Sequence, residues 1–351
     1  MIPMFLLIGI WGSRQRKIHA VYYFFFYTAF GSIFLLLSLL LIYYYTNTLN
    51  WYLLNYINIP IDAQLWIWFF MFLGFSVKVP IVPFHIWLPE AHVEAPTSGS
   101  VLLAGILLKI GSYGLLRFGV FLFPYATNYF SSFVYILSII SIIYISSIAI
   151  RQVDLKKIIA YSSVAHMNFV ILGLISNNIE GLNGSVFLML AHGIVSSALF
   201  ICVGVLYDRY HSRLISYYGN IVNFMPLYST IFFLFILANI SFPGTCNFIG
   251  EFIVLIGVVE DNLFITILSV LSIILSAIYS VWLINRILFG FIKNKLNFYS
   301  DLSKREKYIL LILLFLTFFF GIYPNFILQN LELINLINLE KWLNITISLN
   351  N

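Results

Sequence analysis

The sequence has very little charge. Only 9% of its 351 residues are Asp, Glu, Lys or Arg, whereas soluble globular domains carry about 25%. Hydrophobic residues make up 62% of the chain and aromatic residues 19%. This composition excludes a soluble domain and predicts an all-α polytopic membrane protein, whose spans each need about 20 apolar residues.

Cysteine and the common catalytic motifs are also scarce. Cys202 and Cys246, the two cysteines, lie in apolar segments and show neither metal-ligand spacing nor a disulfide framework. We find no Gly-rich phosphate loop, no Ser-His-Asp arrangement, no CxxC motif and no cleaved signal peptide. We therefore expect this chain to bind no nicotinamide, flavin, iron–sulfur cluster or metal. The net charge of +5 does not indicate nucleic-acid binding, because topology explains its placement.

Apolar segments long enough to span a bilayer follow one another along the chain, and we count about nine and a half helices. No soluble domain or long linker separates them, and a short Asn- and Leu-rich tail follows Pro324. The predicted spans are 1–12 (partial), 20–45, 64–82, 98–118, 128–150, 157–176, 184–206, 226–259, 264–290 and 308–325.

The basic residues gather on one side of this predicted topology, which the positive-inside rule identifies as the cytoplasm or matrix. Four acids, Asp62, Glu180, Glu260 and Asp261, fall on the other side. The one-sided set holds thirteen of the eighteen basic residues: Arg14, Arg16, Lys17, Arg151, Lys156, Lys157, Arg209, Arg213, Lys293, Lys295, Lys304, Arg305 and Lys307.

Five ionisable residues lie deep within spans. Lys109 is eleven residues into its span, about 16 Å along a helix axis. Ionisable groups at this depth are expensive and usually face a polar interior, where burial drives Lys and Glu toward neutrality and His titrates near neutral pH. A satisfied interhelical contact would explain one such residue, but the whole set indicates proton transfer: Lys78, Lys109, His166, His192 and Glu251.

Prolines interrupt two of the spans. Pro80 and Pro83 follow Lys78, and Pro243 interrupts 226–259 in "FPGTCNF". Irregular backbone at membrane depth survives only where protein buries it or where it lines water. A simple kink would explain one break, whereas paired discontinuous helices mark transporter sites. Because proline lacks an N–H, we expect three carbonyls to lose their helical partners: those of Ser76, Val79 and Asn239.

The segment "HIWLPEAHVEAPTSGS" is rich in possible metal ligands, but their spacing matches no zinc motif. We interpret it as a loop leading to a helix start, with Thr97 or Ser98 as the N-cap. The four potential ligands are His85, Glu90, His92 and Glu94.

Long motifs in the chain resemble a known family. They include "PMFLLIGIWGSRQRKIHAVYYFFFYTAFGS", "KVPIVPFHIWLPEAHVEAPTSGSVLLAGILLKIGSYGLLRF", "DLKKIIAYSSVAHMNF", "LAHGIVSSALFICVGVLYDR" and "FPGTCNFIGEF". Together they are similar to subunit 4 of the proton-pumping NADH:ubiquinone oxidoreductase, respiratory complex I, over residues 1–325. The first motif separates subunit 4 from the related subunits 2 and 5.

The resemblance implies an antiporter-like fold with two inverted five-helix repeats, each holding a discontinuous helix. Residues 1–12 would then complete a helix, 13–118 the first repeat, 119–290 the second, and 291–351 a final span and polar tail. Lys78 and Lys109 correspond to the family's channel lysines, His166 and His192 to its bridging histidines, and Glu251 to its exit-side acid.

The family has four more helices before the first motif, and a glutamate there pairs with the lysine at position 78. An unpartnered buried cation is costly. We therefore expect a separate polypeptide to supply those helices and the glutamate, docking against residues 1–12; a misassigned start codon is the alternative.

The resemblance also implies partners and a location. Other complex I subunits, especially subunits 2 and 5, would be neighbours in the mitochondrial inner membrane, and NAD, FMN, iron–sulfur clusters and ubiquinone would be bound by other chains. A subunit of a multi-component cation/proton antiporter is one alternative, because it shares the fold. A scaffold that no longer pumps is another, although the retained deep charges argue against it.

Overall fold

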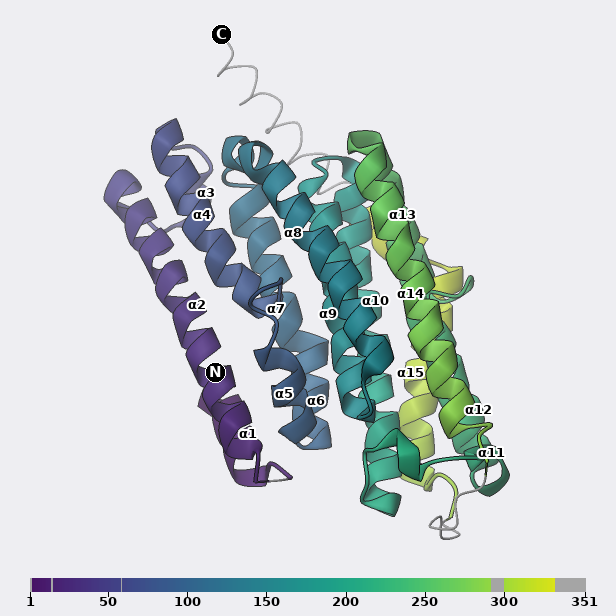
Figure 1. Cartoon of the computed structure of the whole chain (residues 1–351). Coiled ribbons are helices and arrows are strands. Elements are labelled where there is room, and N and C mark those ends of the chain that lie inside the picture. Colours follow the sequence, from purple (N-terminus) through teal and green to yellow (C-terminus); the bar gives the residue numbers. More distant parts are fainter. Residues whose placement is uncertain (1, 14, 58, 292–299, 332–351) are drawn as a thin grey trace.

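The computed structural model describes residues 2–13, 15–57, 59–291 and 300–331. Within them the chain is almost entirely helical, and its one β-feature is an isolated bridge between Asp154 and Leu214. The long helices lie side by side with their axes running in the same general direction (Figure 1). In the described part of the chain, seven helices are long and apolar enough to cross a membrane, or eight if α15 (Lys304–Ile322) and a bent continuation form one span. The predicted all-α polytopic class is confirmed.

The first part of the chain forms a long hairpin and a broken helix. α2 packs along α4, and its first turns also contact α5. The chain is irregular from Val79 to Ile86, between α4 and α5. The elements are α1 (Ile2–Trp11), α2 (Lys17–Thr46), α3 (Trp51–Leu54), α4 (Ile61–Lys78) and α5 (Trp87–Glu94).

The next span is a single helix with two π-helical stretches. It consists of α6 (Thr97–Leu102), η1 (Leu103–Leu107), α7 (Leu108–Gly114) and η2 (Leu115–Val120). π-helical turns are rare and often occur at functional sites, because the wider turn changes which backbone groups are free. Here η1 ends at Leu107, two residues before Lys109.

The centre of the protein is α9. Almost every residue of α9 (Leu155–Ile175) is buried. Four helices pack against it: α5, α8 (Pro124–Arg151), α10 (Ile179–Tyr210) and α13 (Cys246–Asp261). Polar side chains on α9 therefore lie inside protein and away from lipid, where burial without partners costs free energy.

The last part of the chain contains the second broken helix, which the irregular segment 240–245 divides into α12 and α13. Its elements are η3 (Ile215–Tyr217), α11 (Ile221–Phe224), α12 (Pro226–Asn239), α13 (Cys246–Asp261), α14 (Leu263–Ile287) and α15 (Lys304–Ile322).

α10 and α13 approach each other closely because glycines face the contact. A Cβ atom built on Gly184 would lie 2.6 Å from the Val254 nitrogen, and one built on Gly250 would lie 2.9 Å from the Leu188 Cα. Small residues allow helix backbones in membranes to approach this closely. The contact places the residue after Gly250, Glu251, in the buried interior.

The described basic clusters lie at one end of the bundle, as predicted. Lys17 begins α2, Arg151 ends α8, Arg209 ends α10 and Lys304 begins α15. Following the chain in Figure 1, these ends all lie toward the lower end of the view. Arg14, Lys293 and Lys295 lie outside the described residues.

Most predicted spans match helices, but the connections contain more structure than expected. Residues 46–63 include α3, and the predicted loop 83–97 includes the eight-residue α5. The predicted caps Thr97 and Ser98 are wrong, because α6 begins at Thr97 after Pro96 and no side chain caps it.

At the two breaks, the backbone groups form more hydrogen bonds than predicted. The Ser76 carbonyl accepts a hydrogen bond from the Ile81 N–H at 3.0 Å, so Pro80 does not leave it free. A wider turn that spans five residues replaces the normal helical bond, as also occurs between Phe242 and Leu237 at the second break. The expectations for the Val79 and Asn239 carbonyls, and the division into inverted repeats, stay predictions. The tail beyond residue 331 lies outside the described residues.

Candidate functional site: a buried Lys-His-His-Glu relay

Lys109 projects from α7 toward α10. Its Nζ lies 2.8 Å from Nδ1 of His192 and also donates to the Ala104 carbonyl in η1. The π-helical turn thus provides a backbone acceptor for a lysine in the middle of a span. A charged ammonium donates only, so the His192 ring is neutral and accepts at Nδ1 when Lys109 carries its proton.

His192 and His166 form the middle of the site. They come from α10 and α9, and their ring centroids lie 5.4 Å apart. Both side chains are buried, and within the described residues the Nε2 atom of each ring is buried without a hydrogen-bond partner. An imidazole can accept a proton at one nitrogen and release one from the other, which suits both rings to proton transfer.

Glu251 is the last member of the group. It lies on α13, one turn after the second break, and its Oε1 is 2.7 Å from Nδ1 of His166. Both side chains are almost fully buried, with 5% and 6% of their side-chain surfaces exposed. We call Lys109, His192, His166 and Glu251 the relay.

His166 and Glu251 form a short contact in a buried site. Two full charges there would lose their hydration, which costs several kcal/mol per ion, and their mutual attraction would offset part of that cost.

Lys78 does not join the relay. It ends α4 at the first break, is half-buried, and lies with its Nζ 5.8 Å from the centre of the Phe75 ring. Its stem packs near Gly111, two residues beyond Lys109. Among the described residues, no carboxylate lies within ion-pair distance of it. The structure thus brings four of the five predicted site residues together.

Three of the four possible metal ligands, His85, Glu90 and His92, contact different side chains. Glu90 forms an ion pair with Lys157 at 2.6 Å. His92 stacks on Phe200 with ring centroids 4.6 Å apart, and His85 lies edge-on to Tyr144. Within the described residues, no cluster of three or more His, Cys, Asp or Glu side chains forms a metal site.

Two cations expected in loops are in fact buried and hold the first broken helix in place. Arg213 donates to the Val93 carbonyl and to the Ser13 hydroxyl, and Lys156 donates to the Ala95 carbonyl at 2.8 Å. Positive groups stabilise the carbonyl end of a helix. This contact could not be predicted from the sequence, because a basic loop motif does not reveal which cation becomes buried.

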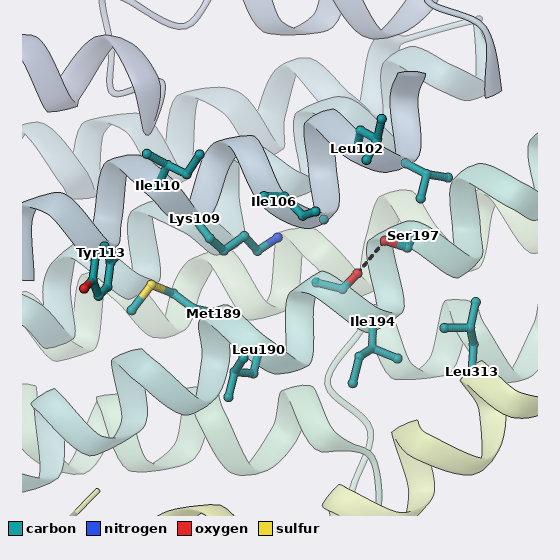
Figure 2. A pocket seen from close by; sticks show the side chains of 13 residues that line it. Leu102, Ile106, Lys109, Ile110, Tyr113, Met189, Leu190, Ile194, Ser197 and Leu313 are labelled. Atoms are coloured by element: carbon teal, nitrogen blue, oxygen red, sulfur yellow. Dashed lines mark hydrogen bonds between the residues drawn. The ribbon is translucent and has the colours of Figure 1, made fainter. Parts of the chain in front are cut away.

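A lateral groove of about 540 Å³ runs beside Lys109 between α7 and α10, and Leu313 of α15 lies at its edge (Figure 2). Figure 2 shows the Lys109 side chain among mainly apolar neighbours such as Ile106, Met189 and Ile194. The groove therefore faces an apolar environment, and the polar connection of Lys109 is inward, to His192.

Comparisons with known proteins agree on a family. Residues 1–278 match the family model described as NADH:quinone oxidoreductase/Mrp antiporter, TM. NADH-ubiquinone oxidoreductase chain 4 of Marchantia polymorpha is 56% identical over 94% of this chain and 67% of its own length. The Arabidopsis thaliana protein of the same name is 55% identical over the same shares. The chain thus spans about two thirds of the length of these relatives.

Solved structures give the same result. A chain of respiratory complex I from Thermus thermophilus with bound NADH matches with a TM-score of 0.91 and 26% identity, over 97% of this chain and 73% of that one. A chain of the Mrp complex from Dietzia sp. DQ12-45-1b shares the fold, with a TM-score of 0.83 and 18% identity over 94% and 70%. This chain belongs to the NADH:quinone oxidoreductase/Mrp antiporter family and, within it, to the chain 4 subunits of NADH-ubiquinone oxidoreductase.

Proposed function

We propose that this chain transfers protons across the membrane as a subunit of NADH:ubiquinone oxidoreductase, using the relay. The observation that carries the proposal is the line of contacts from Lys109 through both histidines to Glu251. The line joins four helices at membrane depth. Groups that are costly to bury and that contact one another in sequence are well suited to passing a charge.

Each relay member has a distinct role in this proposal. Lys109 gains or loses a proton in response to the neighbouring half of the protein. The two imidazoles pass the change on, because each can exchange protons at two nitrogens. Glu251, beside the second break, holds the proton until release toward the end of the bundle that carries Glu260 and Asp261.

Lys78 is the proposed input. Its half-buried position at the first break has no carboxylate nearby among the described residues. We propose that a separate polypeptide supplies an acid that pairs with Lys78, and that loss of this pairing changes the charge of Lys78. An opposite charge nearby favours the protonated lysine, so its departure would favour proton release.

Partners and location follow from the same proposal. Neighbouring antiporter-like subunits 2 and 5 would contact this chain in the mitochondrial inner membrane. NADH oxidation, flavin and iron–sulfur chemistry and ubiquinone reduction would occur in other subunits, because the relay contains only acid–base groups. This chain would contribute to a proton-translocating enzyme without a redox site of its own.

An antiporter subunit is the second candidate, favoured by the fold shared with the Mrp complex chain. The two functions differ in the partners that purify with the chain. Redox subunits that bind NADH and iron–sulfur clusters support the first function. Antiporter subunits without redox partners support the second.

The test of the relay is Lys109→Ala in the assembled complex, reconstituted in proteoliposomes. We expect proton transfer coupled to NADH oxidation to fall about 10²- to 10⁴-fold, the range typical of a lost acid–base group. Lys157→Ala is the matched control, because Lys157 pairs with Glu90 outside the relay. Unchanged pumping by a fully assembled Lys109→Ala complex would show that the chain acts as a scaffold.

A further inference from the structure

Two small internal cavities meet at Tyr279 of α14. Each measures about 10 Å³, close to the space that one water molecule needs. The relay cavity is lined by His166 and Glu251 together with Ser146, Ser272 and Ser276. The second cavity is lined by Ser162, Asn239 and Ser280, and Tyr279 lines both.

The second cavity lies between the relay and the end of the bundle that carries the basic clusters, which we call the basic side. α9 begins at that side, and Ser162 precedes His166 by one turn. α14 ends there, and Ser280 follows Ser276 by one turn. Serines at 272, 276 and 280 repeat every four residues, so they form one polar stripe along α14 from the relay toward the basic side.

Tyr279 carries a hydroxyl that packing alone does not require. Its side chain is 1% exposed. Ser162 and Asn239 line the same cavity and interact with the hydroxyl, but within the described residues neither contact has normal hydrogen-bond geometry. A buried hydroxyl whose hydrogen bonding is incomplete costs up to about 1–3 kcal/mol, and phenylalanine would fill the space without that cost. A water in either cavity would provide the missing partner.

The geometry points to Tyr279 as a bridge that supplies protons from the basic side to Glu251. This inference rests on the proposed function of the relay. The hydroxyl accepts a proton from water in the second cavity and releases its own proton to water in the relay cavity, so one O–H bond forms as another breaks and the phenol is restored. The relay then transmits charge, and this branch supplies the proton that Glu251 releases.

Apolar side chains close the branch toward the basic side. Ile158, Ile159 and Leu283, together with Leu199, line the second cavity and are each 2–3% exposed. Water reaches the serines only when this seal opens. A closed resting state prevents protons from crossing without electron transfer, which a pump requires.

Tyr279→Phe in the assembled complex tests the bridge, because it removes the hydroxyl and keeps the ring. We expect coupled turnover to fall at least tenfold, the quinone KM to stay unchanged, and the solvent deuterium isotope effect to rise because proton supply becomes limiting. Tyr228→Phe is the matched control, since that buried hydroxyl donates to the Cys202 carbonyl away from the relay. We expect it to retain the parental turnover and isotope effect.

Ser162→Val provides a second test, because it fills the second cavity and keeps the Tyr279 hydroxyl. It alone decides the question if Tyr279→Phe fails to assemble. The bridge would be overturned if every assembled variant of the branch kept the parental turnover and isotope effect while Lys109→Ala was inactive. That result would still support the relay. If Lys109→Ala also pumps normally, the proposed function itself is wrong.

Discussion

The two broken helices hold their ionisable residues in contrasting ways. Both breaks contain proline, and both replace a helical bond with a wider five-residue turn. Glu251 beside the second break is buried and lies 2.7 Å from His166. Lys78 at the first break is half-buried and contacts the Phe75 ring. The two breaks thus have similar backbones but different surroundings. Glu251 at the second break has a partner within this chain, whereas Lys78 at the first break is accessible to a partner from elsewhere.

This difference indicates where the signal enters and where it is stored. A group whose partner comes from outside can sense that partner's movement, whereas a group paired internally can hold a proton until its neighbour changes charge. The first break therefore suits input, and the second suits storage and release.

Among these four substitutions, Glu251→Gln should reduce proton transfer the most. Glutamine has the same shape but cannot carry the proton, so we expect coupled proton transfer to fall about 10³-fold, equivalent to about 4 kcal/mol. Proton uptake and NADH oxidation in proteoliposomes measure it. Assembly should remain intact, because an amide can still hydrogen bond to His166. Parental pumping would show that the second break stores no proton.

Lys78→Met should reveal the partner of the first break. If an external acid pairs with Lys78, methionine leaves that acid buried and unpaired, and we expect the assembled complex to lose about 3 kcal/mol of stability. Thermal inactivation of the purified complex measures this change. A more stable complex would contradict the proposed acid, because it would mean that Lys78 was buried without any partner.

Gly250→Ala should weaken the second break by separating α10 from α13. The added Cβ would lie 2.9 Å from the Leu188 Cα, and such overpacking costs about 1–3 kcal/mol. The same thermal assay should show the loss, together with slower pumping as Glu251 moves from His166. Gly9→Ala is the control, because its Cβ would meet only a Val21 methyl at 3.8 Å. Equal stability of both variants would argue against a close α10–α13 contact.

Glu90→Gln should have the smallest effect. The ion pair of Glu90 with Lys157 is partly exposed, at 32% and 21% of the side-chain surfaces, and such pairs contribute about 0–1 kcal/mol. We expect thermal stability within that range of the parent and unchanged pumping. A large loss of pumping would mean that α5, the second half of the first broken helix, depends on this pair for its position.

Much of the fold could be predicted, because lipid imposes a simple rule on sequence. Residues 128–150, for example, are uncharged along their whole length and mostly apolar, and they lie within α8. α5 was missed because its charged, proline-flanked sequence resembles a loop, and it is helical only because α2 and α9 enclose it. A local sequence pattern does not show that distant helices surround a segment.

The residues of the candidate site could be predicted from the sequence, but the contacts between them could not. Lys109, His166, His192 and Glu251 each stand out as ionisable residues in apolar helices. Tyr279 does not stand out, because tyrosine is common in this chain, although the serines spaced every four residues around it are a signal that could have been found. Its importance depends on two cavities that exist only after α9, α12 and α14 have packed.

Three features follow from the amino-acid sequence alone: the spans, the one-sided placement of the basic residues and the short list of deep ionisable groups. Each of these follows from the transfer free energy of individual side chains between water and lipid, which is a local property. Only the packing of the helices shows that four of these groups contact one another, that Lys78 lies apart from them, and that Lys156 and Arg213 are buried. Contacts depend on which helix faces meet, and here glycines on α10 and α13 and the two breaks decide that.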